Sequence, residues 1–435
     1  MFIDAILYVF TSLVAVGMPF LYIYKHQKST RKARAKLKES VERGLTEPVS
    51  LHPVIDPTRC FCAGACLDAC PEGNILGIVN GRAALIAPTK CIGHGACEAA
   101  CPIEAITLVF GTERRGVELP YVKETFETNV RGVYIAGELG GMGLIRNAVT
   151  QGREAIQYLS QTVTRKDPKI LDLAIIGAGP AGLAASLQAM KEKLNFITLD
   201  QDDAGGTILT YPRQKLVMTQ PMDIPLYGKV KFREILKEDL LALWGDIIQR
   251  TGLEVRTKEK VDAIEKPNGY FRVVSSKGEY LAQRVLLAIG RRGTPRKLGV
   301  PGEKSSKVAY RLLEPEQYAK KKVLVVGGGD SAIEAALSLS EQRGTQVTLS
   351  YRKNVFSRIK EKNEKRIEQA IKERRVRAFF ESQVKEIRRE EVILSVKDRV
   401  GRLANDYVFI FIGGVLPTQF LQKIGIRIET KFGAR

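Results

Sequence analysis

Residues 171–182 read Leu171-Asp-Leu-Ala-Ile-Ile-Gly177-Ala-Gly179-Pro-Ala-Gly182, a short apolar run that leads directly into three glycines. An alanine-rich segment follows at residues 183–190, and a second apolar run at residues 196–199 ends in Asp200. Such glycines let the backbone approach a pyrophosphate at a helix N-terminus, and the acidic residue bonds a ribose hydroxyl. A glycine-rich turn is the alternative, but the flanking strands and the acid favour a dinucleotide-binding βαβ unit.

The same pattern recurs downstream, where residues 323–326 lead into Gly327-Gly-Gly329-Asp-Ser-Ala332. The next apolar run, residues 347–349, is followed by Ser350-Tyr-Arg352-Lys353, so cations replace the acid, and Arg358 comes soon after. Basic groups at this strand end suit the 2′-phosphate of NADPH. We therefore expect NADPH rather than NADH; the alternative is NADH beside a solvated basic face. The candidate contacts are Gly327, Gly329, Ala332, Arg352 and Arg358.

All seven cysteines lie upstream of both glycine motifs, in two runs that each end in Cys-Pro. The runs read Cys60-Phe-Cys62-Ala-Gly-Ala-Cys66-Leu-Asp-Ala-Cys70-Pro71 and Cys91-Ile-Gly-His94-Gly-Ala-Cys97-Glu-Ala-Ala-Cys101-Pro102. This rhythm is typical of two-cluster bacterial ferredoxins, in which each run lends its last cysteine to the other run's cluster. Zinc and disulfides are the alternatives, but a zinc ribbon has no use for a proline after each final cysteine.

Two positions depart from the ferredoxin pattern. The second cysteine of the first run is displaced by one place to Cys62, and His94 stands where the second run should have its second cysteine. Together these side chains still supply the eight ligands that two [4Fe-4S] clusters need. We assign Cys60, Cys62, Cys66 and Cys101 to cluster I, and Cys91, His94, Cys97 and Cys70 to cluster II. Imidazole ligation should raise the potential of cluster II; the alternative is a bystander His94 beside a three-iron cluster.

The N-terminus predicts a membrane anchor. Residues 2–24 are apolar apart from Asp4, and a run of lysines and arginines follows. About 20 apolar residues suffice to cross a bilayer. The basic flank predicts a single pass through the cytoplasmic (inner) membrane, with the N-terminus outside and the catalytic domains in the cytoplasm. A buried or interfacial helix is the alternative. The net charge of +20 suits acidic redox partners, and no recognised motif indicates nucleic acid as a partner.

Four segments resemble the thioredoxin reductase family of two-dinucleotide-domain flavoproteins. They are Gly205-Gly206-Thr207, residues 285–290, residues 327–334 and residues 408–413. The resemblance implies that FAD binds the first unit, through Gly177, Gly179, Gly182, Asp200, Gly205, Gly206 and Thr207, and that NADP or NAD binds the second. The family's redox Cys-x-x-Cys is missing, because residues 308–318 contain no cysteine. Electrons that leave FAD are therefore expected to reach the cysteine-rich module.

The family's C-terminal flavin-covering segment has a counterpart at an unexpected place in this chain. Residues 128–138 read Thr128-Asn-Val-Arg-Gly-Val-Tyr-Ile-Ala-Gly137-Glu138 and lead into further glycines and a helix expected at about residues 144–159. We interpret this order as a circular permutation, in which Gly137 and Glu138 contact FAD and Glu138 replaces the usual aspartate. The alternative is an extension of the ferredoxin module that only resembles the flavin segment.

The sequence thus predicts an α/β chain with two Rossmann-like nucleotide-binding domains, a small α+β dicluster ferredoxin domain and one N-terminal transmembrane helix. The expected boundaries are an anchor at 1–24, a basic linker helix at 25–50, the ferredoxin domain at 51–110, the FAD domain at 111–293 with 414–435, and the NAD(P) domain at 294–413.

The expected function is a membrane-anchored NAD(P)H oxidoreductase that passes electrons through FAD to two clusters. The acceptor or donor beyond them is a quinone, a ferredoxin or a cytochrome, and no side chain is expected to act as a catalytic acid or base. Three alternatives stay open. They are an electron-transfer subunit of a respiratory or bifurcating complex, a ferredoxin–NADP reductase working in reverse, and a redox sensor that turns over slowly.

Overall fold

The computed structural model describes the backbone of residues 2–48, 51–164, 167, 169–211, 213, 215–218, 221–232, 234–267, 269–291, 294–356, 359–397 and 399–433. For residues 2–14, 22, 216, 218, 294 and 361 the description is limited to the backbone. The chain divides into two compact units, Met1–Val117 with Lys431–Arg435 and Glu118–Thr430. The short strands β5 (Val117–Pro120) and β26 (Ile428–Lys431) lie where the chain passes from one unit to the other.

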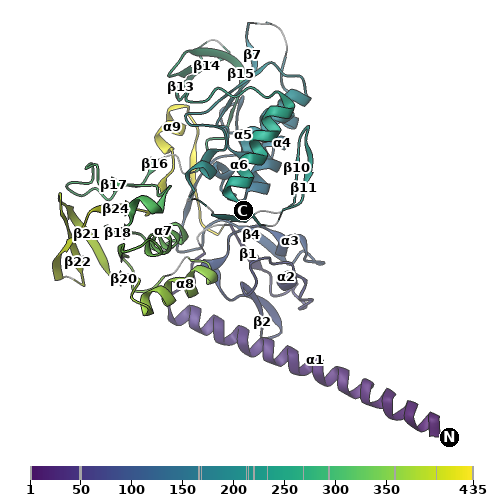
Figure 1. Ribbon diagram of the computed structural model, residues 1–435. Helices are drawn as coiled ribbons and strands as arrows, with labels where there is room; N and C mark the ends of the chain where they lie inside the picture. Colours follow the sequence, from purple (N-terminus) through teal and green to yellow (C-terminus); the bar gives the residue numbers. More distant parts are fainter. Residues whose placement is uncertain are drawn as a thin grey trace. The chain divides into compact units, whose positions relative to one another are not determined.

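The first unit combines one long helix with two small antiparallel strand pairs (Figure 1). The strand pairs are β1 (His52–Ile55) with β4 (Ile106–Val109), and β2 (Leu76–Val79) with β3 (Arg82–Leu85). Each cysteine run contributes one short helix, α2 (Ala65–Asp68) or α3 (Ala96–Ala99), and the 3₁₀ turn η1 (Pro88–Lys90) precedes the second run. Both helices start after a left-handed glycine, Gly64 (φ 79°) or Gly95 (φ 81°), so the two runs fold alike.

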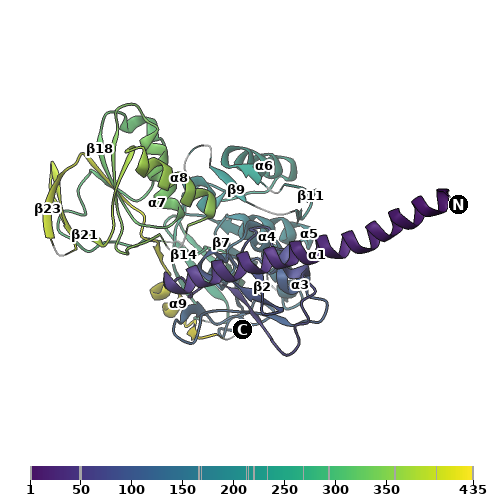
Figure 2. The same cartoon turned by 90° about the horizontal axis from the view of Figure 1, so that it is seen from below.

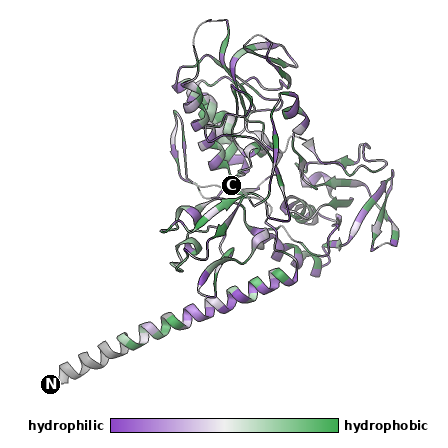
Figure 3. Cartoon of the chain, turned by 180° about the vertical axis from the view of Figure 1, so that it is seen from behind, coloured by the Kyte–Doolittle hydropathy of each residue, from purple (hydrophilic) through white to green (hydrophobic). Residues whose placement is uncertain are grey.

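The long helix α1 (Phe2–Glu42) overturns the prediction of a membrane span. Among the residues whose side chains are described, no helix is long and apolar enough to cross a membrane. From Lys25 onward α1 is rich in charged side chains (Figure 3). Residues 1–14 of the predicted span lie outside the described side chains. The predicted inner-membrane localisation is therefore wrong, and the membrane is not supported as a partner.

The second unit contains two larger sheets, each with one strand that leads into a glycine motif. The first sheet has the strand order β13-β14-β15-β7-β8, with β6 also paired to β15. Its parallel part consists of β6, β15, β7 and β8, as expected for a nucleotide-binding fold. The bounds are β6 (Val133–Ile135), β7 (Leu171–Ile176), β8 (Phe196–Leu199), β13 (Val261–Glu265), β14 (Phe271–Ser275) and β15 (Glu279–Leu287).

Three helices and two antiparallel strand pairs accompany the first sheet. The helices are α4 (Ile145–Ser160), α5 (Pro180–Lys191) and α6 (Lys237–Thr251), with 3₁₀ turns η2 (Glu138–Gly140) and η3 (Gly206–Thr210). The strand pairs are β9 (Leu216–Met218) with β12 (Glu234–Leu236), and β10 (Met222–Ile224) with β11 (Gly228–Val230). Buried side chains from β6, β7 and β15 form one core cluster with Leu421 of the small helix α9 (Thr418–Lys423), so the C-terminal segment also packs on this sheet.

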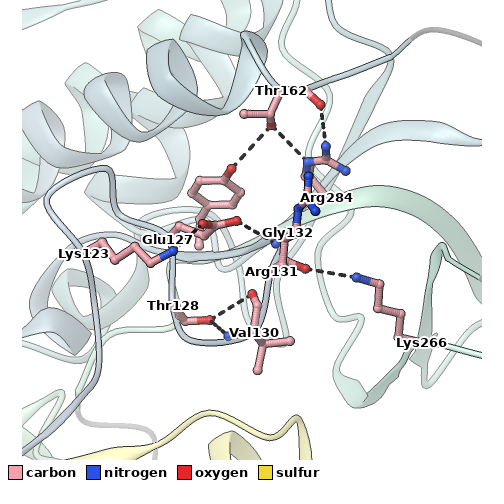
Figure 4. A network of polar contacts seen from close by, with 10 residues as sticks. Lys123, Glu127, Thr128, Val130, Arg131, Gly132, Thr162, Lys266 and Arg284 are labelled. Atoms are coloured by element: carbon pink, nitrogen blue, oxygen red, sulfur yellow. Dashed lines mark hydrogen bonds and ion pairs between the residues drawn. The ribbon is translucent and has the colours of Figure 1, made fainter.

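The segment that precedes β7 is part of this sheet by side-chain contacts as well as by pairing (Figure 4). The Tyr134 hydroxyl in β6 lies 3.4 Å from the Thr162 hydroxyl, and Arg284 of β15 donates to the same hydroxyl at 3.0 Å. Lys266 donates to the Arg131 carbonyl at 3.1 Å. Residues 123–162 are therefore fixed to strands that follow them by more than 100 positions, as Arg284 and Thr162 are separated by 122.

The second sheet is fully parallel, in the order β17-β24-β18-β19-β20. Its strands are β17 (Val308–Ala309), β18 (Lys322–Val326), β19 (Gln346–Ser350), β20 (Val376–Phe379) and β24 (Tyr407–Ile410). Helices α7 (Asp330–Ser340) and α8 (Glu361–Lys372) and the turn η4 (Pro315–Tyr318) accompany it. An antiparallel meander, β21 (Ser382–Ile387), β22 (Glu391–Val396) and β23 (Arg399–Ala404), follows β20, and β16 (Thr294–Pro295) pairs with β25 (Gly414–Val415).

These sheets confirm the predicted α/β class with Rossmann-like nucleotide-binding domains. The expected strand at residues 171–176 is β7, and the expected helix at about 144–159 is α4, displaced by one residue. The sequence patterns succeeded here because buried parallel strands are continuous apolar runs between glycine turns.

Candidate nucleotide and iron-sulfur sites

The first glycine loop has the close backbone contacts that a pyrophosphate cradle requires. Gly177 has φ +107°, and a Cβ there would lie 2.5 Å from the Ala288 carbonyl oxygen. A Cβ on Gly182 would lie 1.7 Å from the Gly177 carbonyl oxygen, so the third glycine lets α5 start against the strand. Gly179 is the N-cap of α5, which therefore presents its free N–H groups at the loop.

A second loop approaches the first one. Gly205 has φ +127° and its N–H donates to the Ala178 carbonyl at 2.8 Å. A Cβ on Gly206 would lie 2.8 Å from the Gly179 Cα, so Gly206 touches the glycine loop itself. Thr207 is in the turn η3 directly after it and is half-buried. The structure thus brings Gly205, Gly206 and Thr207 to the loop where the sequence placed the pyrophosphate.

Asp200 lies at the end of β8, where a ribose would be bound. It is 9% exposed, and its two carboxylate oxygens accept backbone hydrogen bonds from Ala178 at 2.5 Å and Asp202 at 2.8 Å. Burial, reinforced by Asp202 and Asp203, raises the pKa of Asp200 although these hydrogen bonds oppose the shift. Three neighbouring carboxylates make this strand end acidic, which disfavours a 2′-phosphate and suits FAD.

The upstream segment reaches the same loop through Gly137. This residue has φ +85°, and a Cβ there would lie 2.9 Å from the Ala181 Cβ at the start of α5. Its N–H donates to Gln151 Oε1 at 2.8 Å, which ties the loop to α4. Glu138 starts the turn η2 and is half-buried. Sequence reasoning missed Gln151, because one amide on an amphipathic helix carries no signal of such a contact.

The second glycine loop has the same close backbone contacts as the first, but different residues follow the next strand. Gly327 has φ +146°, and a Cβ there would lie 2.3 Å from the Phe411 carbonyl oxygen. Gly329 is the N-cap of α7, and Ala332 is fully buried 3.0 Å from the position of that Gly327 Cβ. Alanine at this third position fills the close contact between helix and strand.

The end of β19 carries no carboxylate. Tyr351 follows β19 at the position where Asp200 follows β8. Ser350, the last residue of β19, is 1% exposed and shares a hydrogen bond of 2.8 Å with the Ser382 hydroxyl. Arg352, two residues beyond it, is exposed. Arg358 lies outside the described residues. The two strand ends therefore differ in charge, acidic at Asp200 and basic at Arg352.

Four cysteine side chains surround one cavity in the first unit. The cavity is lined by Cys60, Cys62, Cys66 and Cys101, with walls that include Ile78 and Ala83 of the β2–β3 hairpin. Burial, together with the neighbouring Cys60 and Cys101, raises the pKa of the buried Cys66 thiol. Cys101 comes from the second run, so the two runs exchange this cysteine in space. The hairpin walls had no sequence signal of their own.

The remaining cysteines form a second group. Burial, together with Cys91 and Cys70, raises the pKa of Cys97 to about 11, and burial with Cys70 and Glu72 raises that of Cys91 to about 11. Clustered, desolvated thiols of this kind need a cation or a metal cluster to hold them as thiolates. In the part of the chain that is described, no three His, Cys, Asp or Glu side chains converge on a single metal ion.

His94, in the second cysteine run, has a ring nitrogen without a partner. Its Nε2 is buried and has no hydrogen-bond partner among the described residues, and burial lowers the pKa of the imidazole. A neutral, buried ring nitrogen of this kind fits a metal ligand. Gly93 has φ +74°, and a Cβ there would lie 2.5 Å from the Leu51 carbonyl oxygen, so the backbone beside His94 is held against the residue that precedes β1.

Two nucleotide loops followed by an acidic and a basic strand end, together with grouped thiols in a ferredoxin-like unit, define an iron-sulfur flavoprotein oxidoreductase. The comparisons agree. The profile of the pyridine nucleotide-disulphide oxidoreductases matches residues 174–433, and that of the 4Fe-4S dicluster domain matches residues 52–102. The chain belongs to the pyridine nucleotide-disulphide oxidoreductase family and carries a 4Fe-4S dicluster domain.

Individual relatives support the predicted enzyme class. Bacilliredoxin reductase of Bacillus subtilis is 29% identical over 266 residues, which are 60% of this chain and 82% of the relative. Ferredoxin–NADP reductase of Streptococcus thermophilus is 32% identical over 196 residues, 44% of this chain and 56% of the relative. The chain thus spans little more than half of the ferredoxin–NADP reductases that it matches.

A solved structure gives the same result. Bacillithiol disulfide reductase of Staphylococcus aureus aligns with a TM-score of 0.55 at 26% identity, over 60% of this chain and 82% of that one. The prediction of an FAD-dependent oxidoreductase is confirmed, and FAD, NADP and 4Fe-4S are supported as its cofactors.

Proposed function

We propose that the chain is an NAD(P)H oxidoreductase that binds one FAD and two [4Fe-4S] clusters and exchanges electrons with a one-electron carrier. The single observation that supports this proposal best is that one chain combines two glycine loops with two clusters of cysteine thiols. Acidic residues follow the strand after the first loop, and basic residues follow the strand after the second. When bound, FAD accepts hydride from a nicotinamide and releases electrons singly, which is the form that iron-sulfur clusters carry. The side chains of the chain hold and orient these groups, and we assign none of them the role of acid or base.

The proposed FAD site includes the upstream segment. β6 pairs with β15, Gly137 lies against α5, and α4 packs on α5 so tightly that a Cβ on Gly152 would be 2.1 Å from the Ala181 carbonyl oxygen. These contacts support our proposal that residues 128–160 are the family's flavin-covering segment, moved by circular permutation to the N-terminal side. Glu138 and Gly137 would then contact FAD, beside Gly177, Gly179, Gly182, Asp200, Gly205, Gly206 and Thr207.

Disulfide reduction, the activity named for the bacillithiol disulfide reductase, is not what we propose for this chain. All seven cysteines lie between positions 60 and 101, so neither nucleotide domain contains a dithiol. The second candidate is ferredoxin–NADP reduction, which the names of several relatives favour. In that case a separate ferredoxin would be the donor and NADP the acceptor.

Analysis of anaerobically purified protein tests the proposed cofactor set. We expect about one FAD, about eight iron atoms and about eight acid-labile sulfides per chain. Zinc in place of iron, or the absence of labile sulfide, would contradict the proposal.

The charge at the second strand end predicts the choice of nucleotide. Arg352→Ala removes a charged hydrogen-bond donor, so we expect NADPH to bind about 10- to 100-fold more weakly while NADH binding is unchanged. Arg399→Ala removes another exposed arginine, on β23 of the same domain, and is the matched control. Equal losses for both nucleotides in titrations of Arg352→Ala would refute the phosphate role.

The orphaned nitrogen of His94 predicts a change in potential. His94→Cys supplies a thiolate in place of neutral imidazole, so we expect the potential of cluster II to fall by on the order of 100 mV while both clusters remain. His94→Ala should instead lose iron from cluster II. Redox titration followed by EPR measures both, and an unchanged potential in His94→Cys would show that His94 is a bystander.

A further inference from the structure

The second half of α1 has one buried face. Ala33 and Ser40 are 5% and 4% exposed, and Lys36 and Leu37 between them are half-buried. This spacing of three, four and seven residues is that of one helix face packed against a partner. The partner is the β2–β3 hairpin, beside which α1 runs in two views (Figures 1 and 2).

The contact between α1 and β2 leaves no room for an added methyl group. A Cβ built on Gly77 of β2 would lie 2.7 Å from the Ala33 Cβ and 2.9 Å from the Ile86 Cδ1. Such distances are shorter than carbon atoms tolerate without movement of one element. Two small residues, Ala33 and Gly77, thus meet where the helix and the strand approach each other.

Two polar contacts fix the helix at either end of this approach. The Ser40 hydroxyl donates to the Ile86 carbonyl at 2.8 Å in a buried position. Arg34 donates to Asn80 Oδ1 at 3.0 Å, at the turn that joins β2 to β3. A buried hydrogen bond of a serine hydroxyl contributes about 1 kcal/mol and fixes the register of the helix on the hairpin.

The opposite face of the same hairpin lines the cluster I cavity. Ile78 and Ala83 are cross-strand partners, and both are cavity walls. Successive residues of a strand point to opposite faces, so Gly77 faces α1 while its neighbour Ile78 faces the cavity. The hairpin is therefore a single layer between α1 and the four cysteines of cluster I.

The ion pairs of α1 do not explain why the helix packs on the β2–β3 hairpin. Lys36 and Arg43 both pair with Glu39, at 3.1 Å and 2.8 Å, and Lys38 pairs with Glu42 at 3.7 Å. These ion pairs join side chains of α1 and of Arg43 directly after it and are partly exposed, so they contribute little to the hairpin contact. Packing at Ala33 is the feature that the structure singles out.

We propose that residues 30–42 of α1 form a fixed outer wall of the cluster I site, which keeps water and small oxidants from the cavity through the thin β2–β3 hairpin. Without the helix, one face of a two-stranded hairpin would be open to water, and isolated hairpins are marginally stable. The shell around a metal site controls solvent access and the stability of the site. The inference rests on the proposed function, since it requires that a cluster occupies the cavity.

The test compares two leucine substitutions on one helix, Ala33→Leu at the buried face and Ala35→Leu at an exposed position. Iron release to a chelator is followed anaerobically, with the EPR signal of cluster II in the same sample as internal reference. We expect Ala33→Leu to lose cluster I about tenfold faster than the wild type, and Ala35→Leu to match the wild type.

A methyl swap provides the second arm if Ala33→Leu does not fold. Gly77→Ala should accelerate iron loss from cluster I. The double variant Ala33→Gly with Gly77→Ala should restore part of the slow rate, because it removes the methyl group of Ala33 from the contact while Ile86 Cδ1 remains 2.9 Å from the new Cβ. If both Ala33→Leu and Gly77→Ala released iron from cluster I at the wild-type rate, the proposal that α1 shields this site would be refuted. Wild-type protein without any cluster would overturn the proposed function instead, so the two failures are distinguishable.

Discussion

Replacing Gly152 by alanine is expected to lower the free energy of unfolding of the second unit by about 3 kcal/mol, the upper end of the range for overpacked sites. The added Cβ would lie 2.1 Å from the Ala181 carbonyl oxygen, which is backbone and cannot turn away. α4 would have to leave α5, and it would take with it Gln151 and the Gly137 loop that Gln151 holds. We therefore also expect at least a tenfold weaker retention of FAD.

The matched control is Gly245→Ala, in the middle of α6 of the same domain. A Cβ there meets nothing within 4 Å, and the position is exposed. Alanine favours a helix by about 1 kcal/mol over glycine, so this variant should be slightly stabilised and should keep its flavin. Thermal unfolding and flavin absorbance after gel filtration measure both variants. Full flavin content and unchanged melting of Gly152→Ala would show that α4 is no part of the flavin domain.

Replacing Cys70 by serine is expected to remove cluster II and halve the iron content, from about eight atoms per chain to about four. Cys70 belongs to the first run in sequence, but its thiol is near enough to Cys91 and Cys97 of the second run to contribute to their raised pKa values. The cluster that remains in Cys70→Ser should have the EPR spectrum of the one that remains in Cys97→Ser.

The complementary pair is Cys62→Ser and Cys101→Ser, whose side chains line the cluster I cavity. Both variants should keep cluster II and share one spectrum, which differs from that of Cys70→Ser. If Cys70→Ser and Cys62→Ser instead left the same cluster behind, each run would bind its own cluster and the exchange of cysteines would be wrong.

Much of the nucleotide-binding architecture could be predicted from the sequence, because its signals are local. A glycine turn at Gly177 or Gly327 between an apolar strand and a helix allows few other structures, and the strand ends carry their charge contrast in the sequence itself. The sequence pattern of residues 128–138 gave no partner for this segment, and its pairing with β15 is a long-range contact that only the structure shows.

Contacts between distant small residues could not be predicted in this way. No sequence pattern links Gly77 to Ala33. A helix rich in lysine and arginine is interpreted as a solvated linker, because the sequence does not show that one of its faces is buried. The prediction of an N-terminal span rested on hydropathy alone, whereas no helix among the residues with described side chains is long and apolar enough to cross a membrane, and the later part of α1 packs on a hairpin. The contacts of Gln151 and Gly152 with the glycine loop depend on tertiary approach and not on propensity.

Anaerobic titration of the isolated protein with NADPH, followed by optical and EPR spectroscopy, tests the central claim most directly. We expect the flavin absorbance to bleach and the signals of reduced iron-sulfur clusters to appear in the same titration, with no other protein present. Bleaching of the flavin while the iron stays oxidised, at every ratio of nucleotide to protein, would contradict the claim that one chain joins the nicotinamide site to the clusters.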